Sequence, residues 1–456
     1  MDNFLLDKFL KIALWIYIGS VVLLFIFYRQ EKEVVTVKKQ NQIQNQNQNQ
    51  NKTQNQNKTQ IQNKTAQNKL VRFDTPKTEP KITAISNLGA KLQFQEECKL
   101  KSSTKADTKK VSIAAVGDVL AHKVLQNQAQ NHSQGFKSIW SQAIPYLRKA
   151  DIAYANLEGT AAAGMSYTGW PNFNYPPSIL DDLKDSGIDI LSTANNHSLD
   201  RSSKGVNLTI EALQNRDINY TGTKHTDFKN VPWHTLTRVN GMTIAWIACT
   251  HHANFIDKSG RRDRYNQVLY CGSKPAWNPS KLNPILEEEI KALANSKNID
   301  AVIVTPHWGI ENENKPRKQQ KQMAQAMANA GATAIIGTHP HVIQPWQMLA
   351  TEDGREVLVN YSLGNFITRA ERASKNWRNA MLLIFNLSQD GSEKARVSGV
   401  GVVPMEMTYS RGVHRLTVNT RSAKNHAAKF FSPKSFVNIN QYFSQIGGCE
   451  NKNLSR

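Results

Sequence analysis

From residue 111 onward, short apolar runs alternate with stretches of helical periodicity, and this alternation restricts the fold more than any other feature. Seven runs have the length and bounds of buried strands: 111–117, 152–159, 188–197, 242–249, 300–309, 332–341 and 357–366. Helix-like stretches lie between many of them, at 135–149, 178–186, 202–215, 281–297 and 316–330. Strands that alternate with helices predict an α/β fold. The later runs 379–388 and 396–407 read mostly as strand and predict a second sheet.

The N-terminal region contains one strongly apolar segment. Residues 12–28 (IALWIYIGSVVLLFIFY) carry no charge and approach the length that spans a bilayer. No small-residue cleavage site follows, so a retained transmembrane signal anchor over residues 1–30 is expected, rather than a cleaved signal peptide or a buried helix. Lys and Arg residues flank the segment on both sides, and the positive-inside rule alone would place the body in the cytoplasm.

Residues 31–110 are predicted to be a disordered tether. Between 40 and 69 the chain is mostly Gln and Asn, with the unit QNKT repeated, and such a tract buries too little apolar surface to offset its ordering entropy. Residues 1–110 also carry 19 Lys/Arg against 9 Asp/Glu, so much of the net charge of +21 lies outside the predicted body. The basic balance suits a membrane surface or an anionic polymer. No sequence pattern of a nucleic-acid-binding module is present.

Polar side chains follow most of the predicted strands at the point where each strand ends. They are Asp118, Glu158, Asn195, Asn196, His197, His307, His339 and His341. Ligands of open α/β sheets bind outside the carboxyl ends of the strands, so we expect these side chains to gather there. Oxygen and imidazole donors without cysteine suit Mn, Zn or Fe, and a bridging carboxylate can hold two ions. Helix capping and turn formation are the alternative explanation.

Six motifs together resemble the bacterial capsule-synthesis protein A (CapA) family, also called the poly-gamma-glutamate capsule family, which is related to the calcineurin-like metallophosphoesterases. They are GDVL (117–120), NLEGT (156–160), ANNHSLD (194–200), HWG (307–309), GTHPHVIQP (337–345) and YSLGNF (361–366). The resemblance covers about residues 111–370. It implies a metallophosphoesterase-like α/β/β/α sandwich with mixed sheets over 111–420, followed by a C-terminal extension over 421–456.

The resemblance also implies roles for individual residues. One or two divalent ions (Mn, Zn or Fe) would be held by Asp118, Glu158, Asn196, His307, His339 and His341. His197 would steady phosphoryl oxygens or protonate the leaving group, and Asp200 would orient it. Ser362 and Asn365 would lie near the site without an assigned role.

Two positions depart from the metallophosphoesterase pattern. Leu120 stands where the first motif has a histidine, and Glu158 replaces the bridging aspartate with a side chain one methylene longer. His122 could substitute for the missing histidine, although a helix start would point it elsewhere. The sequence is therefore compatible with a hydrolase that uses a metal-bound hydroxide, and also with a non-catalytic polymer-binding or export accessory that keeps a degenerate metal site.

Family resemblance implies an envelope-anchored protein with an extracytoplasmic body. It would act in the synthesis or export of an anionic capsule polymer such as poly-gamma-glutamate, beside polymer synthase membrane proteins. A phosphatase facing the cytoplasm is the alternative that the flanking charges allow.

Three weaker features accompany the motifs. Cys249 and Cys271 could form a disulfide across the excursion between them, or remain buried thiols. One histidine of the pair His251–His252 could face the site, although a loop feature is the more common arrangement. The basic run 258–265 could contact an anionic substrate or form a solvated loop.

Overall fold

The computed structural model describes residues 108–228, 230–254, 263, 265–273, 281–371, 373–431 and 435–436. The chain divides into two units, Met1–Phe94 and Gln95–Arg456, and every described residue belongs to the second unit. The predicted anchor lies outside the described residues, as does the predicted tether up to residue 107. Within the ranges given above, no helix is long and apolar enough to cross a bilayer.

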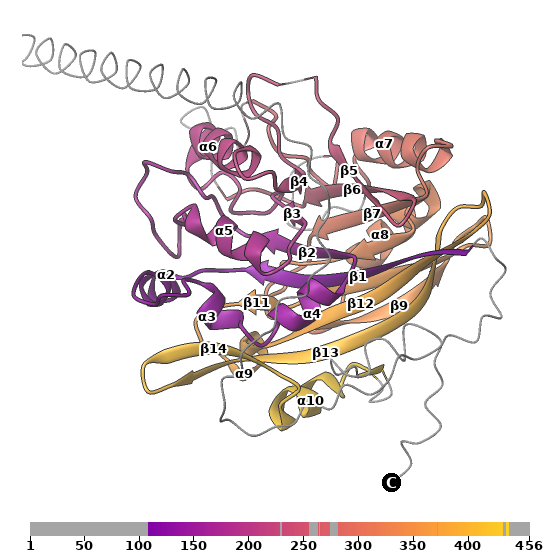
Figure 1. Cartoon of the computed structure of the whole chain (residues 1–456). Helices are drawn as coiled ribbons and strands as arrows, with labels where there is room; N and C mark the ends of the chain where they lie inside the picture. The colour runs from indigo at the N-terminus through magenta and orange to yellow at the C-terminus, as the bar shows by residue number, and fades with distance from the viewer. Residues whose placement is uncertain are drawn as a thin grey trace, which may run out of the picture. The chain divides into compact units, whose positions relative to one another are not determined.

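Two mixed β-sheets form the centre of the described unit (Figure 1). The first has the order β14-β13-β12-β1-β2-β3-β4, with β11 also paired to β1. Strands β1 to β4 and β11 run parallel, whereas β12, β13 and β14 add antiparallel ladders on the other side of β1. Its strands are β1 (Thr108–Val119), β2 (Ile152–Leu157), β3 (Ile190–Ser192), β4 (Asn219–Thr221), β11 (Asn365–Ile367), β12 (Asn379–Asp390), β13 (Arg396–Ser410) and β14 (Val413–Val418).

The second sheet has the order β5-β6-β7-β8-β10-β9. Strands β6, β7, β8 and β10 are parallel, and an antiparallel strand closes each edge. Its strands are β5 (His234–Val239), β6 (Met242–Thr250), β7 (Ala301–His307), β8 (Ala334–Ile336), β9 (Ile343–Ala350) and β10 (Glu356–Leu363).

The two sheets pack face to face through one hydrophobic layer. Alternate residues of β1 (Val111, Ile113 and Ala115) lie in this layer with residues of β6, β7 and β8 from the other sheet. The intervening residues of β1, Ala114 and Val116, point to the opposite face of their sheet. This period of two explains why the inner strands read as continuous apolar runs, since both of their faces are buried.

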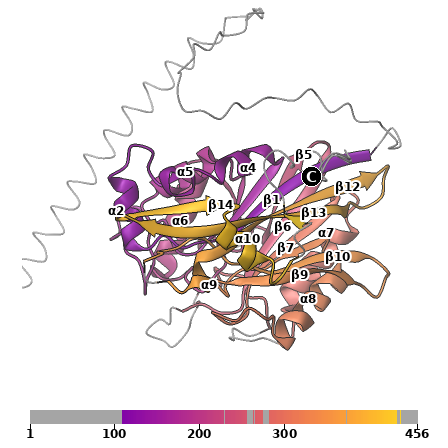
Figure 2. The ribbon, with the colours of Figure 1, turned by 90° about the horizontal axis from the view of Figure 1, so that it is seen from below.

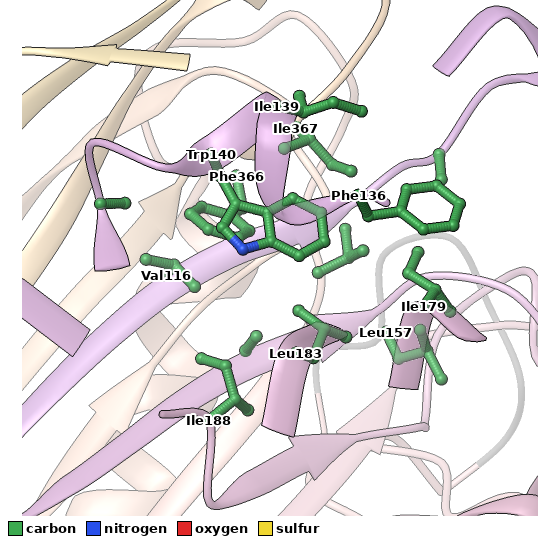
Figure 3. Close-up of a cluster of buried hydrophobic side chains, with 14 of the residues drawn as sticks. Val116, Phe136, Ile139, Trp140, Leu157, Ile179, Leu183, Ile188, Phe366 and Ile367 are labelled. Carbon is green, nitrogen blue, oxygen red and sulfur yellow. The ribbon is translucent and has the colours of Figure 1, made fainter. Parts of the chain in front are cut away.

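The described helices are α2 (Lys123–Gln130), α3 (Lys137–Trp140), α4 (Ile144–Lys149), α5 (Ser178–Asp185), α6 (Ser202–Gln214), α7 (Pro284–Asn295), α8 (Lys318–Ala330), α9 (Lys375–Arg378) and α10 (Arg421–Ala427). Most of them cover the outer faces of the sheets, whereas α10 adds Ala427 to the hydrophobic layer between the sheets. The outer core of the first sheet contains residues of α2 to α5 and is centred on Trp140, which packs among Phe136, Phe366 and Ile367 (Figure 3). Helices α7 and α8 cover the outer face of the second sheet.

The α/β fold with two mixed sheets is confirmed, but the predicted grouping of strands is wrong. The runs 379–388 and 396–407 do not form a separate second sheet, because β12 pairs with β1 and extends the first sheet. The predicted helical stretch 135–149 is two short helices, and Pro145 lies in the first turn of α4. Helix α10 lies at the start of the predicted C-terminal extension and packs on β12 and β13 (Figure 2).

Candidate metal centre

The polar residues predicted at strand ends lie together, but they come from both sheets. Asp118 is at the end of β1, Glu158 follows β2, and Asn196 and His197 follow β3 in the first sheet. His307 ends β7, and His339 and His341 follow β8 in the second sheet. All of these side chains are buried. The site therefore lies where the carboxyl ends of two facing sheets meet, rather than in the crevice of one open sheet.

Glu158 is the central carboxylate of this cluster. It is fully buried, and neither of its carboxylate oxygens has a hydrogen-bond partner. Its Oε1 lies 3.6 Å from Nε2 of His307 and 3.6 Å from Nε2 of His341. Buried carboxylate oxygens are ordinarily hydrogen-bonded, so these unpartnered oxygens are the feature of the cluster that best fits a bound cation.

Two groups of potential metal ligands share Glu158. One contains Glu158, His339 and His341, and the other contains Asp118, Glu158 and His307. Within each group the ligand atoms lie within 4.8 Å of one another. The oxygen and imidazole donors are those that Zn, Mn and Fe accept in proteins. The residues present therefore fit a divalent metal centre in which Glu158 belongs to both groups of potential ligands.

Amide side chains connect the ligands to each other. The Nδ2 group of Asn156 donates a hydrogen bond to Oδ1 of Asp118 (2.8 Å) and lies 3.2 Å from Nδ1 of His307. Oδ1 of Asn196 lies 2.8 Å from Nε2 of His307. Asn156 was not predicted as a site residue, although it lies within the predicted strand 152–159 and begins the NLEGT motif. Its place in that motif, two residues before Glu158, could have identified it.

The turn after β8 holds its two histidines in an uncommon backbone conformation. His339 has φ 96° and His341 has φ 59°, a region that residues other than glycine seldom adopt and that is concentrated at functional sites. Nδ1 of His341 lies 2.9 Å from Oδ1 of Asn365 and 3.1 Å from Oδ2 of Asp118. These acceptors hold the Nδ1 proton, so Nε2 of His341 is the nitrogen available toward Glu158. Asn365 thus acquires a role as the residue that orients His341.

His197 and Asp200 form a hydrogen-bonded pair beside the cluster. Nδ1 of His197 lies 2.6 Å from Oδ2 of Asp200, which also accepts from the backbone N–H of Phe173 at 2.5 Å. The Phe173 ring packs edge-on against the His197 imidazole at 4.8 Å. The predicted contact between His197 and Asp200 is therefore present, and it leaves Nε2 as the nitrogen that can meet a substrate.

Burial and charge set the protonation of the cluster. Burial raises the pKa of Glu158 well above its ordinary value, with the Asp118 carboxylate adding to the effect. Burial lowers the pKa values of His307 and His339, and neighbouring imidazoles lower them further, so both rings are neutral and can ligate. Burial also opposes protonation of His341, but Glu158 and Asp118 outweigh it and raise the pKa of His341 to about 10. A metal ion bound there would compete with this proton.

The pair His251–His252 lies at the site rather than in a solvated loop. Both residues are buried, and the His251 ring lies 4.4 Å from the His339 ring. Nδ1 of His251 lies 2.7 Å from the backbone oxygen of His307. A disulfide between Cys249 and Cys271 is formed directly beside this pair. Most of the basic run 258–265 lies outside the described residues, as do Cys98 and Cys449.

The structure places no histidine of the first motif (117–120) or directly after it in either group of potential ligands. Leu120 is buried and belongs to the apolar core. His122 directly precedes α2 and belongs to neither ligand group. The predicted substitution of the missing ligand by His122 therefore has no support in this arrangement.

Fold and site together describe an α/β protein with two facing sheets and a buried cluster of histidines and carboxylates. The family model described as "Bacterial capsule synthesis protein PGA_cap" matches residues 112–370, and the chain belongs to this family. The chain is 29% identical over 311 residues to the PGA biosynthesis protein CapA of Bacillus subtilis, covering 65% of this chain and 75% of that protein. It is 26% identical over 293 residues to the capsule biosynthesis protein CapA of Bacillus anthracis, covering 63% of this chain and 66% of that protein.

A comparison of structures gives only a distant similarity. The NAD nucleotidase of Haemophilus influenzae matches with a TM-score of 0.40 and 14% identity, covering 72% of this chain and 57% of that one. At this level the similarity carries no inference about activity.

Proposed function

We propose that this protein is a metal-dependent hydrolase of the metallophosphoesterase type that acts in the synthesis or export of an anionic capsule polymer. The names of the two Bacillus relatives refer to capsule and PGA biosynthesis, which supports this context. The observation that carries the catalytic part is the buried Glu158, whose unpartnered oxygens are shared by two groups of ligands.

The residues of the candidate site would have two roles, metal binding and proton transfer. Asp118, His307, His339 and His341 would hold the metal with Glu158, and Asn196 would complete the donor set beside His307. A divalent ion held there would act as a Lewis acid toward a phosphoryl or carbonyl oxygen. His197, oriented by Asp200, would donate a proton to the leaving group through Nε2. The burial of the cluster lowers the dielectric around these groups and strengthens their electrostatic effect.

Metal content of variants tests the site directly. Full-length protein, purified without chelator and loaded with Mn or Zn, would be measured by mass spectrometry for bound metal. Because Glu158 belongs to both ligand groups, Glu158→Gln should lose all bound metal. His339→Ala and His307→Ala each disrupt one group, so each should lose one ion of a two-ion centre. Glu406→Gln, a buried glutamate on β13, is the matched control and should retain the metal of the wild type.

Hydrolysis of p-nitrophenyl phosphate, bis(p-nitrophenyl) phosphate and poly-gamma-glutamate would be measured on the same samples. Activity should follow metal content across the variants. A folded wild type that binds no added Mn or Zn, or a Glu158→Gln variant that keeps its metal, would contradict the proposal.

A non-catalytic role as a polymer-binding or export accessory is the second candidate. It is favoured by Leu120, a buried apolar side chain where the related phosphoesterases place a metal ligand. In that case the protein would retain metal and lose stability without it, but no substrate would be hydrolysed in any metal form.

For localisation, we propose an anchor at the N-terminus, an extracytoplasmic body and a function beside polymer synthase membrane proteins. The disulfide between Cys249 and Cys271 supports an oxidising compartment. Alkaline phosphatase fused to the C-terminus should be active if the body is extracytoplasmic, and a cytoplasmic body would leave it inactive.

A further inference from the structure

A pocket of about 320 Å³ lies directly beside the candidate metal centre. Its lining includes His122, Trp170, Asn312, Arg369, Ser374 and Trp377. The Trp377 ring forms the wall shared with the metal cluster, because it packs against the His341 imidazole at 4.8 Å. A substrate group in this pocket would therefore sit next to the groups proposed to perform the chemistry.

The pocket has a positive charge that is not neutralised by its lining. Among the described residues of the lining, Arg369 is the charged one and none carries a carboxylate. The neighbouring Glu371 is engaged by a close ion pair with Nε2 of His414. Within the described ranges, Arg369 has no carboxylate at ion-pair distance. A half-buried guanidinium of this kind is suited to carboxylate and phosphate oxygens, which it can bind through two parallel hydrogen bonds.

His122 adds a second polar group that lacks a partner. Its side chain is 7% exposed, and its Nε2 is buried without a hydrogen bond. Burial, together with the charge of Arg369, lowers the pKa of His122 to about 3, so the imidazole is neutral near pH 7. A neutral imidazole can donate one hydrogen bond to an anionic ligand without adding charge. Buried polar groups are ordinarily satisfied, so an unpartnered nitrogen in the lining points to a ligand.

Two tryptophans line the pocket, and one of them is held in place by hydrogen bonds. The Trp377 indole N–H donates to Oδ1 of Asn312, and its backbone N–H donates to Oγ of Ser374, so its ring is fixed. Trp170 is 72% exposed and offers a second aromatic face in the lining of this pocket. Aromatic walls beside a cation bind a ligand that carries an apolar stem and a charged end.

We propose that this pocket is a substrate subsite that binds one carboxylate or phosphate group through Arg369 and His122, with the stem of that group between Trp170 and Trp377. The inference deepens the proposed function, on which it rests, because it adds an anionic recognition element beside the metal centre. The subsite would select polymers with an acidic group on the unit that neighbours the reacting bond.

Calorimetric titration of full-length, metal-loaded protein tests the subsite. The two probes are a γ-linked glutamate trimer, which carries carboxylates on short apolar stems, and inorganic phosphate. Arg369→Gln should weaken the binding of at least one probe by tenfold or more with unchanged metal content. The probe that responds identifies the anion. Arg238→Gln, an exposed arginine on β5, is the matched control and should bind both probes as the wild type does.

Trp170→Ala is a second variant, and it should fold normally because the Trp170 side chain is mostly exposed in the wild type. This variant should bind the γ-linked glutamate trimer severalfold more weakly than the wild type does. Its affinity for inorganic phosphate should not change, since phosphate has no apolar stem. Binding of both probes within twofold of the wild type in Arg369→Gln and Trp170→Ala would overturn the subsite. If the wild type holds no metal, binding that depends on Arg369 would still support the subsite and would reject only the hydrolase.

Discussion

At the scale of single residues, the hydrogen bond from His197 to Asp200 determines which imidazole nitrogen can act. The carboxylate accepts the Nδ1 proton at 2.6 Å, so Nε2 is the ring nitrogen that can exchange a proton with a substrate. Asp200→Asn removes this charge but can still accept from the backbone N–H of Phe173. If the protein is a hydrolase, we expect kcat to fall by about 10²–10⁴-fold, as for the loss of a positioned acid or base.

Metal content separates this positioning role from a structural one. The Asp200→Asn variant should bind as much metal as the wild type, since Asp200 belongs to neither ligand group. Asp181→Asn, which removes one partner of a surface ion pair with Arg216, is the control and should leave kcat unchanged. A loss of metal in Asp200→Asn would show that Asp200 supports the centre itself, and an unchanged kcat would exclude its proposed role.

At the scale of secondary-structure elements, the junction of β1 and β11 places Asp118. The backbone N–H of Asp118 donates to the oxygen of Gly364 at 3.1 Å, and Asp118 pairs with Asn365 across the ladder. A Cβ on Gly117 would lie 1.8 Å from that same oxygen, so only glycine allows the two strands to approach this closely. Two segments almost 250 residues apart thus position one candidate metal ligand and the residue that orients another.

Helix α10 carries a buried histidine that should make stability depend on pH. Burial, followed by the charges of Lys429 and Lys375, lowers the pKa of His426 from 6.5 to about 4. Between these values the unfolded chain binds the proton and the folded chain does not, so stability is full above pH 6.5 and falls as the pH drops toward 4. At pH 5 the contribution lost is about 1–2 kcal/mol.

Urea unfolding at pH 7.5 and pH 5 measures this dependence. His426→Gln should lose less stability between the two pH values than the wild type, by about 1–2 kcal/mol. His132→Gln, an exposed histidine after α2, should change with pH as the wild type does. Equal pH dependence in His426→Gln and the wild type would show that α10 does not bury a neutral imidazole.

At the scale of the whole molecule, local sequence predicted the elements better than their assembly. The runs at 111–117 and 242–249 are strands because both of their faces are buried, and this is visible as apolar composition. Which strands share a sheet was not visible, because it depends on pairings such as that of Val111 with Leu387, far apart in the chain. The candidate site residues followed from motifs at strand ends, whereas the roles suggested for Asn156 and for Arg369 of the proposed subsite rest on contacts between distant segments.

The disulfide between Cys249 and Cys271 connects the stability of the body to its compartment. It joins the end of β6 to the chain 22 residues later, and a loop of this size predicts a stabilisation of about 3 kcal/mol. We expect a reducing agent to lower the melting temperature of the wild type by several degrees. The double variant Cys249→Ala/Cys271→Ala should melt at the temperature of the reduced wild type and should not respond to the reducing agent.

The other two cysteines provide the matched control. Cys98→Ala/Cys449→Ala keeps the disulfide and should respond to the reducing agent as the wild type does. Equal melting temperatures of oxidised and reduced wild type, with four free thiols in the folded protein, would contradict the disulfide and remove the support it gives to an extracytoplasmic body.

If the expected shift is found, a reducing cytoplasm would deprive the chain of about 3 kcal/mol, a large share of the 5–15 kcal/mol that typically stabilises a protein. The stability of the body would then depend on export, which agrees with the proposed position outside the membrane.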